Sequence, residues 1–139
     1  MKSEVSVNWL EDMSFETEIN GHRLVIDASE EFGGKNKGPR PKPLVLLALA
    51  GCTAMDVISL FKKFRMDVKD LKITVEGDMS EEHPKQYTKM NVIYNITGNN
   101  IDIKKAEKAV KLSMESYCGV SAQYKKGIDI SYEIKIIPA

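Results

Sequence analysis

An apolar run from Leu44 to Met55 constrains the fold of this chain more than any other stretch. Every residue in the run is apolar or small, so a helix built from it would be buried on all of its faces. A membrane-spanning helix needs roughly 20 apolar residues in a row, and Asp56 ends the run well before that length. We therefore predict the central helix of a soluble protein, with no membrane as partner.

The residue types at both ends of this helix indicate where it starts and stops. Pro43 suits the first helical turn, because an N–H at that position would have no helical partner. Basic side chains near the other end, at Lys62, Lys63 and Arg65, interact favourably with the negative end of the helix dipole. The predicted helix thus runs from Pro43 to about Arg65.

The residues before this helix alternate in the way that short strands do. Weak alternation covers residues 3–9 and 14–19. Asn20 and Gly21 follow, and both tolerate the positive φ of a type I′ turn between paired strands. We expect a small antiparallel sheet with a hairpin at this turn, followed by a flexible loop over residues 31–43, where glycine, proline and lysine replace any periodic pattern.

The glycines and lysines of residues 33–38 resemble a phosphate-binding loop in composition only. Such a loop requires Gly-Lys-Ser/Thr between a strand and a helix, and that sequence is missing here. Basic residues nevertheless cluster in this loop just before the apolar helix, at Lys35, Lys37, Arg40 and Lys42. A role of these cations in stabilising a thiolate stays open.

The C-terminal half alternates between strand and helix patterns. Period-two alternation predicts strands at residues 68–77, 87–97 and 128–136, of which the first two are antiparallel neighbours and the last has one buried face. Asp102 is a candidate N-cap for a helix that reaches about Tyr117. Residues 118–121 break that helix, and a short helix follows until about Gly127. The sequence therefore predicts an α+β fold.

Composition and charge exclude several classes of protein. The 139 residues fit a single domain, 1–139, with a hydrophobic core of its own. Lys+Arg 20 and Asp+Glu 20 cancel, so the positive charge expected of a nucleic-acid-binding protein is missing. The stretch from Met1 to Val7 lacks the apolar core of a signal peptide, which predicts a cytoplasmic protein with reduced thiols. We expect no cofactor.

Two cysteines, Cys52 and Cys118, are the reactive side chains of interest. In an apolar helix Cys52 could simply be a buried packing residue, because free cysteine is among the most buried residue types. Cys118 lies at the start of a short predicted helix, where the helix dipole would lower its pKa. Two thiols in a cytoplasmic chain also allow a redox pair. A metal site is not expected, since neither His22 nor His83 lies at ligand spacing from another His or a Cys.

Two segments together resemble a known family: Gly38 to Asp56, which contains Ala-Gly-Cys-Thr, and Ser113 to Ala122, which contains Ser-Tyr-Cys-Gly-Val-Ser. They are similar to the OsmC/Ohr family of osmotically inducible and organic-hydroperoxide-resistance proteins, in particular to the branch with an Ala-Gly-Cys-Thr helix. The resemblance extends over most of the chain. It implies an OsmC-like fold, in which curved antiparallel β-sheets wrap around two long central helices in an intertwined homodimer with active sites at the dimer interface.

The resemblance also implies roles for single residues. Cys52 matches the family's peroxidatic cysteine and Cys118 matches the resolving cysteine. The family's peroxidases hold the thiolate with an Arg and with a Glu shortly before the first cysteine. This sequence has Lys42 and Pro43 where that carboxylate would be expected. Arg40 is the nearest candidate for the cation, and Arg23 is the second choice.

The resulting hypothesis is a thiol-dependent hydroperoxide reductase that takes part in oxidative-stress defence. Cys52 would reduce an organic hydroperoxide, Cys118 would form a disulfide with it, and an external dithiol would reset the pair. Leu46, Leu49 and Met55 would line the site and favour an alkyl substituent. The alternative is a non-enzymatic protein that binds an apolar ligand, or a thiol redox sensor, and the missing carboxylate favours it.

Overall fold

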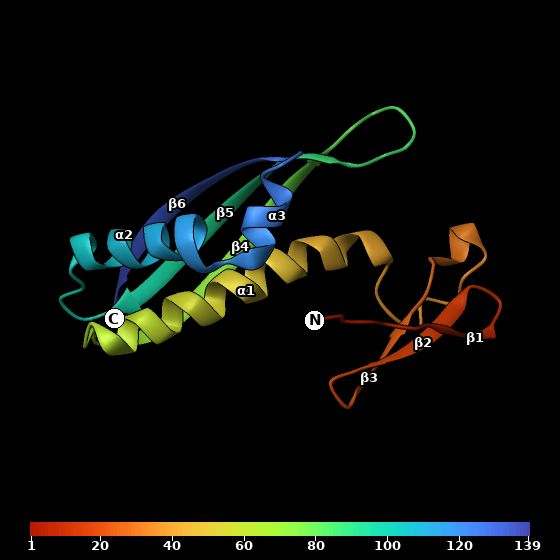
Figure 1. Ribbon diagram of the computed structural model, residues 1–139, viewed down its shortest axis with the longest axis horizontal. Coiled ribbons are helices and arrows are strands. Elements are labelled where there is room, and N and C mark those ends of the chain that lie inside the picture. Colours follow the sequence, from red (N-terminus) through yellow and green to blue (C-terminus); the bar gives the residue numbers. More distant parts are fainter. The chain divides into compact units, whose positions relative to one another are not determined.

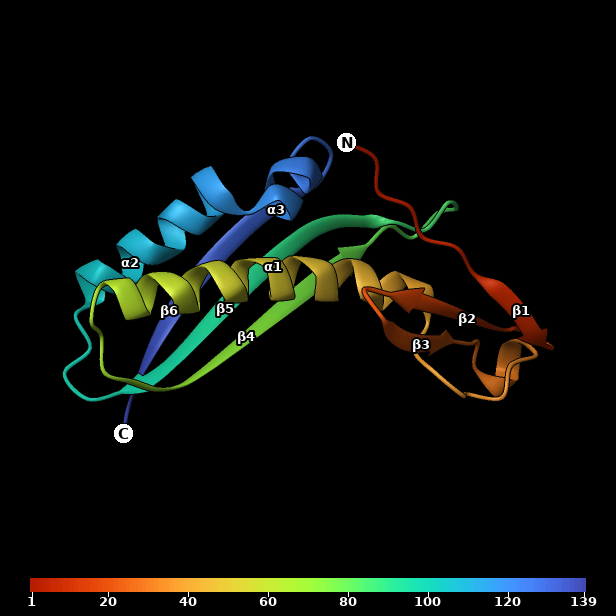
Figure 2. The same ribbon diagram turned by 60° about the horizontal axis from the view of Figure 1, so that its bottom comes forward.

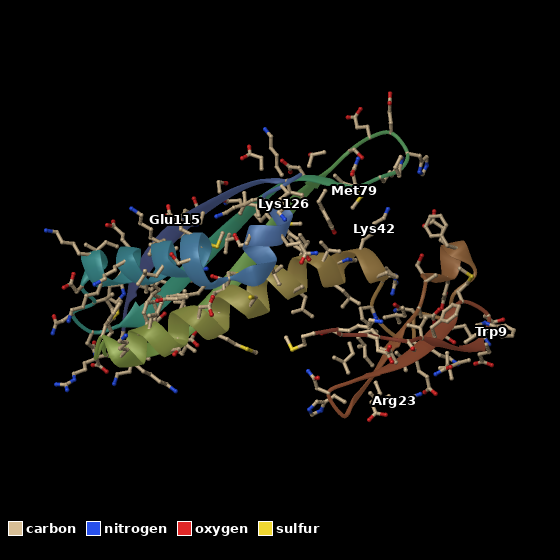
Figure 3. The ribbon with its side chains drawn as sticks, in the orientation of Figure 1. Trp9, Arg23, Lys42, Met79, Glu115 and Lys126 are labelled. Carbon is tan, nitrogen blue, oxygen red and sulfur yellow. The ribbon has the colours of Figure 1, made fainter.

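A three-stranded antiparallel sheet forms the body of the first of two compact units into which the chain divides, residues 1–45 and 46–139. The structure is a computed structural model that describes all residues, 1–139. The strands β1 (Asn8–Glu11), β2 (Ser14–Ile19) and β3 (His22–Ile26) follow one another in this sheet. The side chains of Trp9 and Arg23 are exposed on it (Figure 3).

The predicted hairpin is confirmed. Ile19 pairs with His22, and the two residues between them have positive φ, 52° at Asn20 and 82° at Gly21. This geometry matches the twist of the flanking strands. The first strand is shorter than predicted and begins later, at Asn8 rather than near residue 3.

The loop after β3 is held in place by Asp27, in contrast to the flexible loop predicted from its composition. The Asp27 carboxylate accepts hydrogen bonds from the backbone N–H groups of Ala28, Lys35 and Lys37, at 2.7, 3.2 and 3.1 Å. These bonds lower the Asp27 pKa against the opposing effect of burial. A short 3-10 helix, η1 (Glu30–Phe32), lies within the loop. Composition identified a loop but could not show the side chain that orders it.

Three helices lie on one face of a second three-stranded sheet in residues 46–139 (Figures 1 and 2). The long helix α1 comprises Pro41–Lys63, and most of its residues belong to the second unit. The bounds of the remaining elements are β4 (Val68–Met79), β5 (Tyr87–Gly98), α2 (Ile103–Leu112), a π-helical turn η2 (Ser113–Tyr117), α3 (Gly119–Tyr124) and β6 (Asp129–Pro138). The observed architecture is the predicted α+β class.

The sheet confirms the predicted pairing and alternation. β4 and β5 are antiparallel, and β6 pairs with β5 in parallel. In β5 one face is almost completely buried, through Met90, Val92, Tyr94 and Ile96. The buried face predicted for β6, an edge strand of the sheet, is only partly covered, since Ile130 and Ile134 are half-buried and Tyr132 is exposed.

Within the single chain, helix α1 is buried through one stripe, whereas its sequence predicts burial on all faces. The buried residues recur every fourth position and are Leu49, Thr53, Val57 and Phe61. Outside this stripe Leu47 and Met55 are 62% and 74% exposed. A single sheet can cover only one side of a helix. By length and composition alone α1 could also cross a membrane, a test that core helices of soluble proteins pass as well.

The helix ends follow the predicted chemistry. The Asp102 carboxylate accepts from the N–H groups of Lys104 and Lys105, which confirms the N-cap of α2. Helix α1 starts two residues before Pro43 and ends at Lys63. Arg65 then takes a left-handed conformation with φ 56°, as helix-terminating residues commonly do.

Candidate active site

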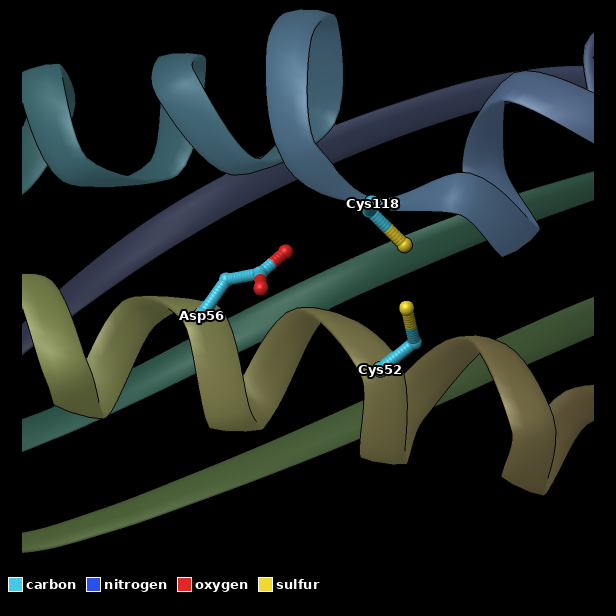
Figure 4. Close-up of side chains that lie close together, drawn as sticks. All are labelled: Cys52, Asp56 and Cys118. Carbon is cyan, nitrogen blue, oxygen red and sulfur yellow. The ribbon is translucent and has the colours of Figure 1, made fainter.

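Cys52 and Cys118 come together in the second unit, on facing elements (Figure 4). Cys52 lies in the middle of α1, and Cys118 is the residue before α3. Their sulfur atoms and a carboxylate oxygen of Asp56 all lie within 4.8 Å of one another. Both cysteines are free thiols. The two cysteines of the chain therefore form one site.

The π-helical turn η2 directs two side chains of this segment toward α1. The backbone N–H of Cys118 donates to the carbonyl of Ser113 at 2.7 Å, which closes the wide turn and ends the helix. A turn of this type inserts an extra residue and thereby changes which side chains share a face. As a result both Ser113 and Cys118 are buried and contact groups of α1.

The two thiols differ in their accessibility. Cys52 is half-buried, which does not fit the interpretation of a fully buried packing residue, whereas Cys118 is only 3% exposed. Cys118 Sγ accepts a hydrogen bond from the N–H of Ser121 at 3.3 Å. A reagent from solution would therefore reach Cys52 first.

The predicted lowering of the Cys118 pKa is wrong. Burial raises the pKa of this thiol to about 11 from its ordinary 9.0, and the neighbouring Cys52 raises it further. The N–H groups of Ser121 and Val120 act in the opposite direction but are outweighed. Because α3 has only six residues, its dipole is too short to offset the burial of a charged sulfur.

Asp56 is a member of the site that the sequence analysis did not identify. It follows Cys52 by four positions on α1, so both side chains project from the same helix face. Ser113 donates to Asp56 Oδ2 at 3.0 Å. The signal that could have found it is a single carboxylate one helical turn after a cysteine in an otherwise apolar helix.

A chain of buried hydroxyl groups supports the Asp56 carboxylate. Thr53 Oγ1 lies 2.8 Å from Ser113 Oγ and 2.7 Å from the Tyr94 hydroxyl. Each hydroxyl has one proton to donate, and Ser113 gives its proton to the carboxylate. Thr53 must then donate to Ser113, and Tyr94 to Thr53. The chain therefore runs in one direction, from β5 through α1 to η2, and ends on Asp56.

The predicted cations form contacts within the first unit. Arg40 donates to Asn36 Oδ1 at 2.7 Å and to the carbonyl of Gly38 at 2.8 Å. Arg23 forms an ion pair with Glu16 at 2.8 Å. The thiols belong to the second unit, so a role of Arg40 at the sulfur atoms stays a prediction, with Arg23 as second choice.

The predicted apolar lining does not form one surface in this chain. Leu49 is completely buried in the core, whereas Met55 is 74% exposed on another side of α1. Leu46 lies against Gly77 of β4. Met55 points to another side of the helix because it stands six positions after Leu49 and nine after Leu46, which at about 3.6 residues per turn is a rotation of about 120° and about 180° around the axis.

An α+β fold with two converging thiols defines a dithiol protein, and comparison with known proteins places it in a family. Residues 34–133 match the family of OsmC-like proteins, and the chain belongs to this family. The family predicted from the two cysteine segments is thereby confirmed.

Individual relatives cover nearly the whole chain. It is 31% identical to the protein YhfA of Escherichia coli K12, over 98% of this chain and 99% of that protein. A crystal structure of a hypothetical protein from Aquifex aeolicus is 32% identical, covers 98% of each chain and has a TM-score of 0.82. The organic hydroperoxide resistance protein OhrB of Bacillus subtilis shares the fold with a TM-score of 0.68 at 16% identity, over 97% of this chain and 98% of that chain.

Proposed function

We propose that this protein is a thiol-dependent hydroperoxide reductase in which Cys52 and Cys118 form the redox pair. The observation that carries the proposal is the approach of the two sulfur atoms to within 4.8 Å. A disulfide bond is about 2.05 Å long, so a modest movement of the two side chains joins them. The family contains proteins named for organic hydroperoxide resistance, which supports the same chemistry here.

Cys52 acts first because it is the accessible thiol. Its thiolate attacks the outer oxygen of the hydroperoxide, the O–O bond breaks, and the alkoxide takes up a proton and leaves as an alcohol. Cys52 becomes a sulfenic acid in this step. The two electrons that reduce the peroxide come from the Cys52 sulfur.

Cys118 then attacks the sulfenic sulfur and expels hydroxide. Since burial keeps the Cys118 proton on its sulfur, the attack needs a proton acceptor close by. The Asp56 carboxylate lies within 4.8 Å of both sulfur atoms and is positioned by Ser113. Asp56 takes the proton from Cys118 and passes it to the departing hydroxide, so that water leaves and a disulfide remains. An external dithiol reduces the disulfide and restores both thiols.

The active form in this proposal is a cytoplasmic homodimer of single-domain chains. The apolar side chains of Leu47 and Met55 are exposed on α1 of the single chain, and a second copy packed on this helix would bury them. A second copy is the occupant implied by the family resemblance. Arg40 of the first unit is the proposed thiolate-stabilising cation of this assembly.

A second candidate function is binding of an apolar ligand without turnover. A hollow of about 650 Å³ in the first unit supports it, with a mostly apolar lining that includes Phe15, Ile26 and Phe32. Arg40 and Lys42 at the same hollow suit a ligand with an acidic group. The thiols would then only report oxidation.

Turnover separates the two functions. Wild-type protein with tert-butyl hydroperoxide and excess dithiothreitol should consume many equivalents of peroxide per chain. Cys52→Ser should not exceed the background rate, and Glu115→Gln, an exposed change in η2, should behave as wild type. Consumption that stops after one equivalent per chain with excess dithiol present would favour the sensor or binding protein.

A further inference from the structure

We propose that the reduced protein binds one Zn²⁺ ion through Cys52 Sγ, Asp56 and Cys118 Sγ, and that disulfide formation abolishes this site. The sequence predicts no metal site, because neither of its two histidines lies at ligand spacing from another His or a Cys. The ligand set that the structure brings together contains no histidine, and it comes from two elements that are far apart in the chain.

The geometry fits a tetrahedral ion. Zinc binds sulfur at about 2.3 Å and carboxylate oxygen at about 2.0–2.2 Å, so its ligand atoms lie about 3.5–3.8 Å apart. The three candidate atoms already lie within 4.8 Å of one another. Small side-chain rotations bring them to bonding distance, and a water molecule would complete the fourth position.

The charges at the site favour a cation. Two thiolates and a carboxylate carry three negative charges when all are deprotonated, and the ion pairs in the structure involve other residues. A divalent cation offsets most of this charge, and two soft sulfur ligands select zinc over magnesium or calcium.

The surroundings also match those of a metal ligand. A carboxylate that binds a metal is usually held by a further hydrogen bond, and Ser113 supplies it to Asp56. The hydroxyl chain through Thr53 and Tyr94 fixes Ser113 in turn. Cys52 and Asp56 are half-buried, which leaves the ion a path from solution.

Zinc binding and oxidation exclude each other. Binding converts two thiols into two metal-bound thiolates and releases two protons. A two-electron oxidant removes one electron from each thiolate and joins the two sulfur atoms in a disulfide. The ion is then released, because a disulfide offers no thiolate ligand. Zinc would therefore protect both cysteines from overoxidation, and an oxidant that forms the disulfide would release it.

The test compares zinc affinity of the reduced protein with that of the protein oxidised by diamide, by competition with a chromophoric zinc indicator. We expect the reduced protein to take one zinc ion per chain from the indicator. The disulfide form should take none. Co²⁺ in place of Zn²⁺ should give thiolate-to-cobalt charge-transfer absorption. No zinc uptake by the reduced protein would refute the site.

Variants identify the ligands. Asp56→Asn keeps the shape of the side chain but loses its charge, and should weaken zinc binding about 10-fold or more. Cys52→Ser should weaken it further, with the fold checked by circular dichroism. Zinc affinity should be unchanged in Glu115→Gln and in the double variant His22→Gln/His83→Gln, whose residues are exposed. Equal affinity of Asp56→Asn and wild type, or loss of binding in the histidine variant, would overturn the proposal.

This test is independent of peroxidase activity, because neither zinc nor diamide involves a hydroperoxide. Zinc binding in a protein without peroxide turnover would leave the zinc site standing and refute the proposed function. Peroxide turnover without zinc binding would do the reverse.

Discussion

The hydroxyl of Ser113 donates to the carboxylate of Asp56 at 3.0 Å and joins the π-helical turn to the long helix α1. This bond holds a carboxylate beside two thiols at the end of the apolar run. An oxygen of the Asp56 carboxylate lies within 4.8 Å of both sulfur atoms. The packing of the second unit therefore positions Asp56 for its proposed role as proton acceptor.

Asp56→Asn should slow formation of the Cys52–Cys118 disulfide by about 10²-fold or more, the usual contribution of a positioned proton acceptor. Asparagine still accepts a hydrogen bond from Ser113, so the fold should be retained. The rate of disulfide formation is measured by mass spectrometry of samples quenched at successive times after addition of one equivalent of hydroperoxide. Glu115→Gln is the matched control, since it removes an exposed carboxylate from the same turn as Ser113 (Figure 3). An unchanged rate in Asp56→Asn would remove Asp56 from the mechanism.

The two cysteine variants should fail at different steps. Cys52→Ser should consume no peroxide, because a hydroxyl is a much weaker nucleophile than a thiolate at neutral pH. Cys118→Ser should consume about one equivalent and then stop with a sulfenic or more oxidised Cys52, since the resolving thiol is missing. Intact mass and thiol titration distinguish these products. Wild type should lose both thiols as an intramolecular disulfide, and a covalent dimer on a non-reducing gel would instead assign Cys118 to the partner chain.

The buried hydroxyl chain should contribute measurably to stability. Thr53 and Ser113 are completely buried, so Thr53→Val leaves hydroxyl groups without partners and should cost about 1–3 kcal/mol in the free energy of unfolding. Ser113→Ala should have a similar effect. Because both residues belong to one network, the double variant should lose less free energy of unfolding than the two single variants lose together. Urea denaturation of the four proteins tests this, and strict additivity would argue against a connected chain.

The exposed face of α1 should mediate dimer formation. Leu47 is 62% exposed in the single chain, so Leu47→Lys should leave the chain folded and weaken the dimer. Light scattering after size exclusion at micromolar concentration gives the mass directly. Glu115→Lys introduces the same side chain outside α1 and should remain dimeric. A well-folded wild-type monomer under these conditions would contradict the dimer proposal and its shared site.

Alkaline titration should report on Tyr94. Burial raises the pKa of Tyr94 to about 12 from its ordinary 10.0, despite the opposing hydrogen bond with Thr53. Three neighbouring groups raise its pKa further, namely Cys118 just before α3, Tyr132 on β6 and Asp56 on α1. The folded state therefore keeps a proton that the unfolded chain releases near pH 10.0. Its contribution to stability is complete below that pH and is lost as the pH rises toward about 12.

Urea denaturation between these pH values measures the Tyr94 effect. The free energy of unfolding of Tyr94→Phe should decline less steeply with pH than that of wild type, since the variant has no phenol proton at this position. Tyr132→Phe is the comparison. The ring of Tyr132 lies edge-on to that of Tyr94, with the two ring centroids 6.4 Å apart, on β6 at the edge of the sheet. Parallel curves for wild type and Tyr94→Phe would show that Tyr94 does not titrate in this range.

Local patterns in the sequence determined most of the secondary structure. Asn20 and Gly21 specify a hairpin because few other residues accept their backbone conformation, and Asp102 caps a helix through its own nearest neighbours. Alternation in β5 predicts its buried face. The two cysteine segments, through their resemblance, also identified the family. All of these features depend on residues close together in the chain.

Only the tertiary structure decided what surrounds the thiols. The approach of Cys52 to Cys118 depends on how α1, η2 and the sheet pack, which no local pattern encodes. The same packing places Asp56 in the site and buries Cys118, so that its pKa rises where the helix start alone predicted a decrease. Burial of a charge is a property of everything around it, and the sequence near Cys118 contains only a small part of those surroundings.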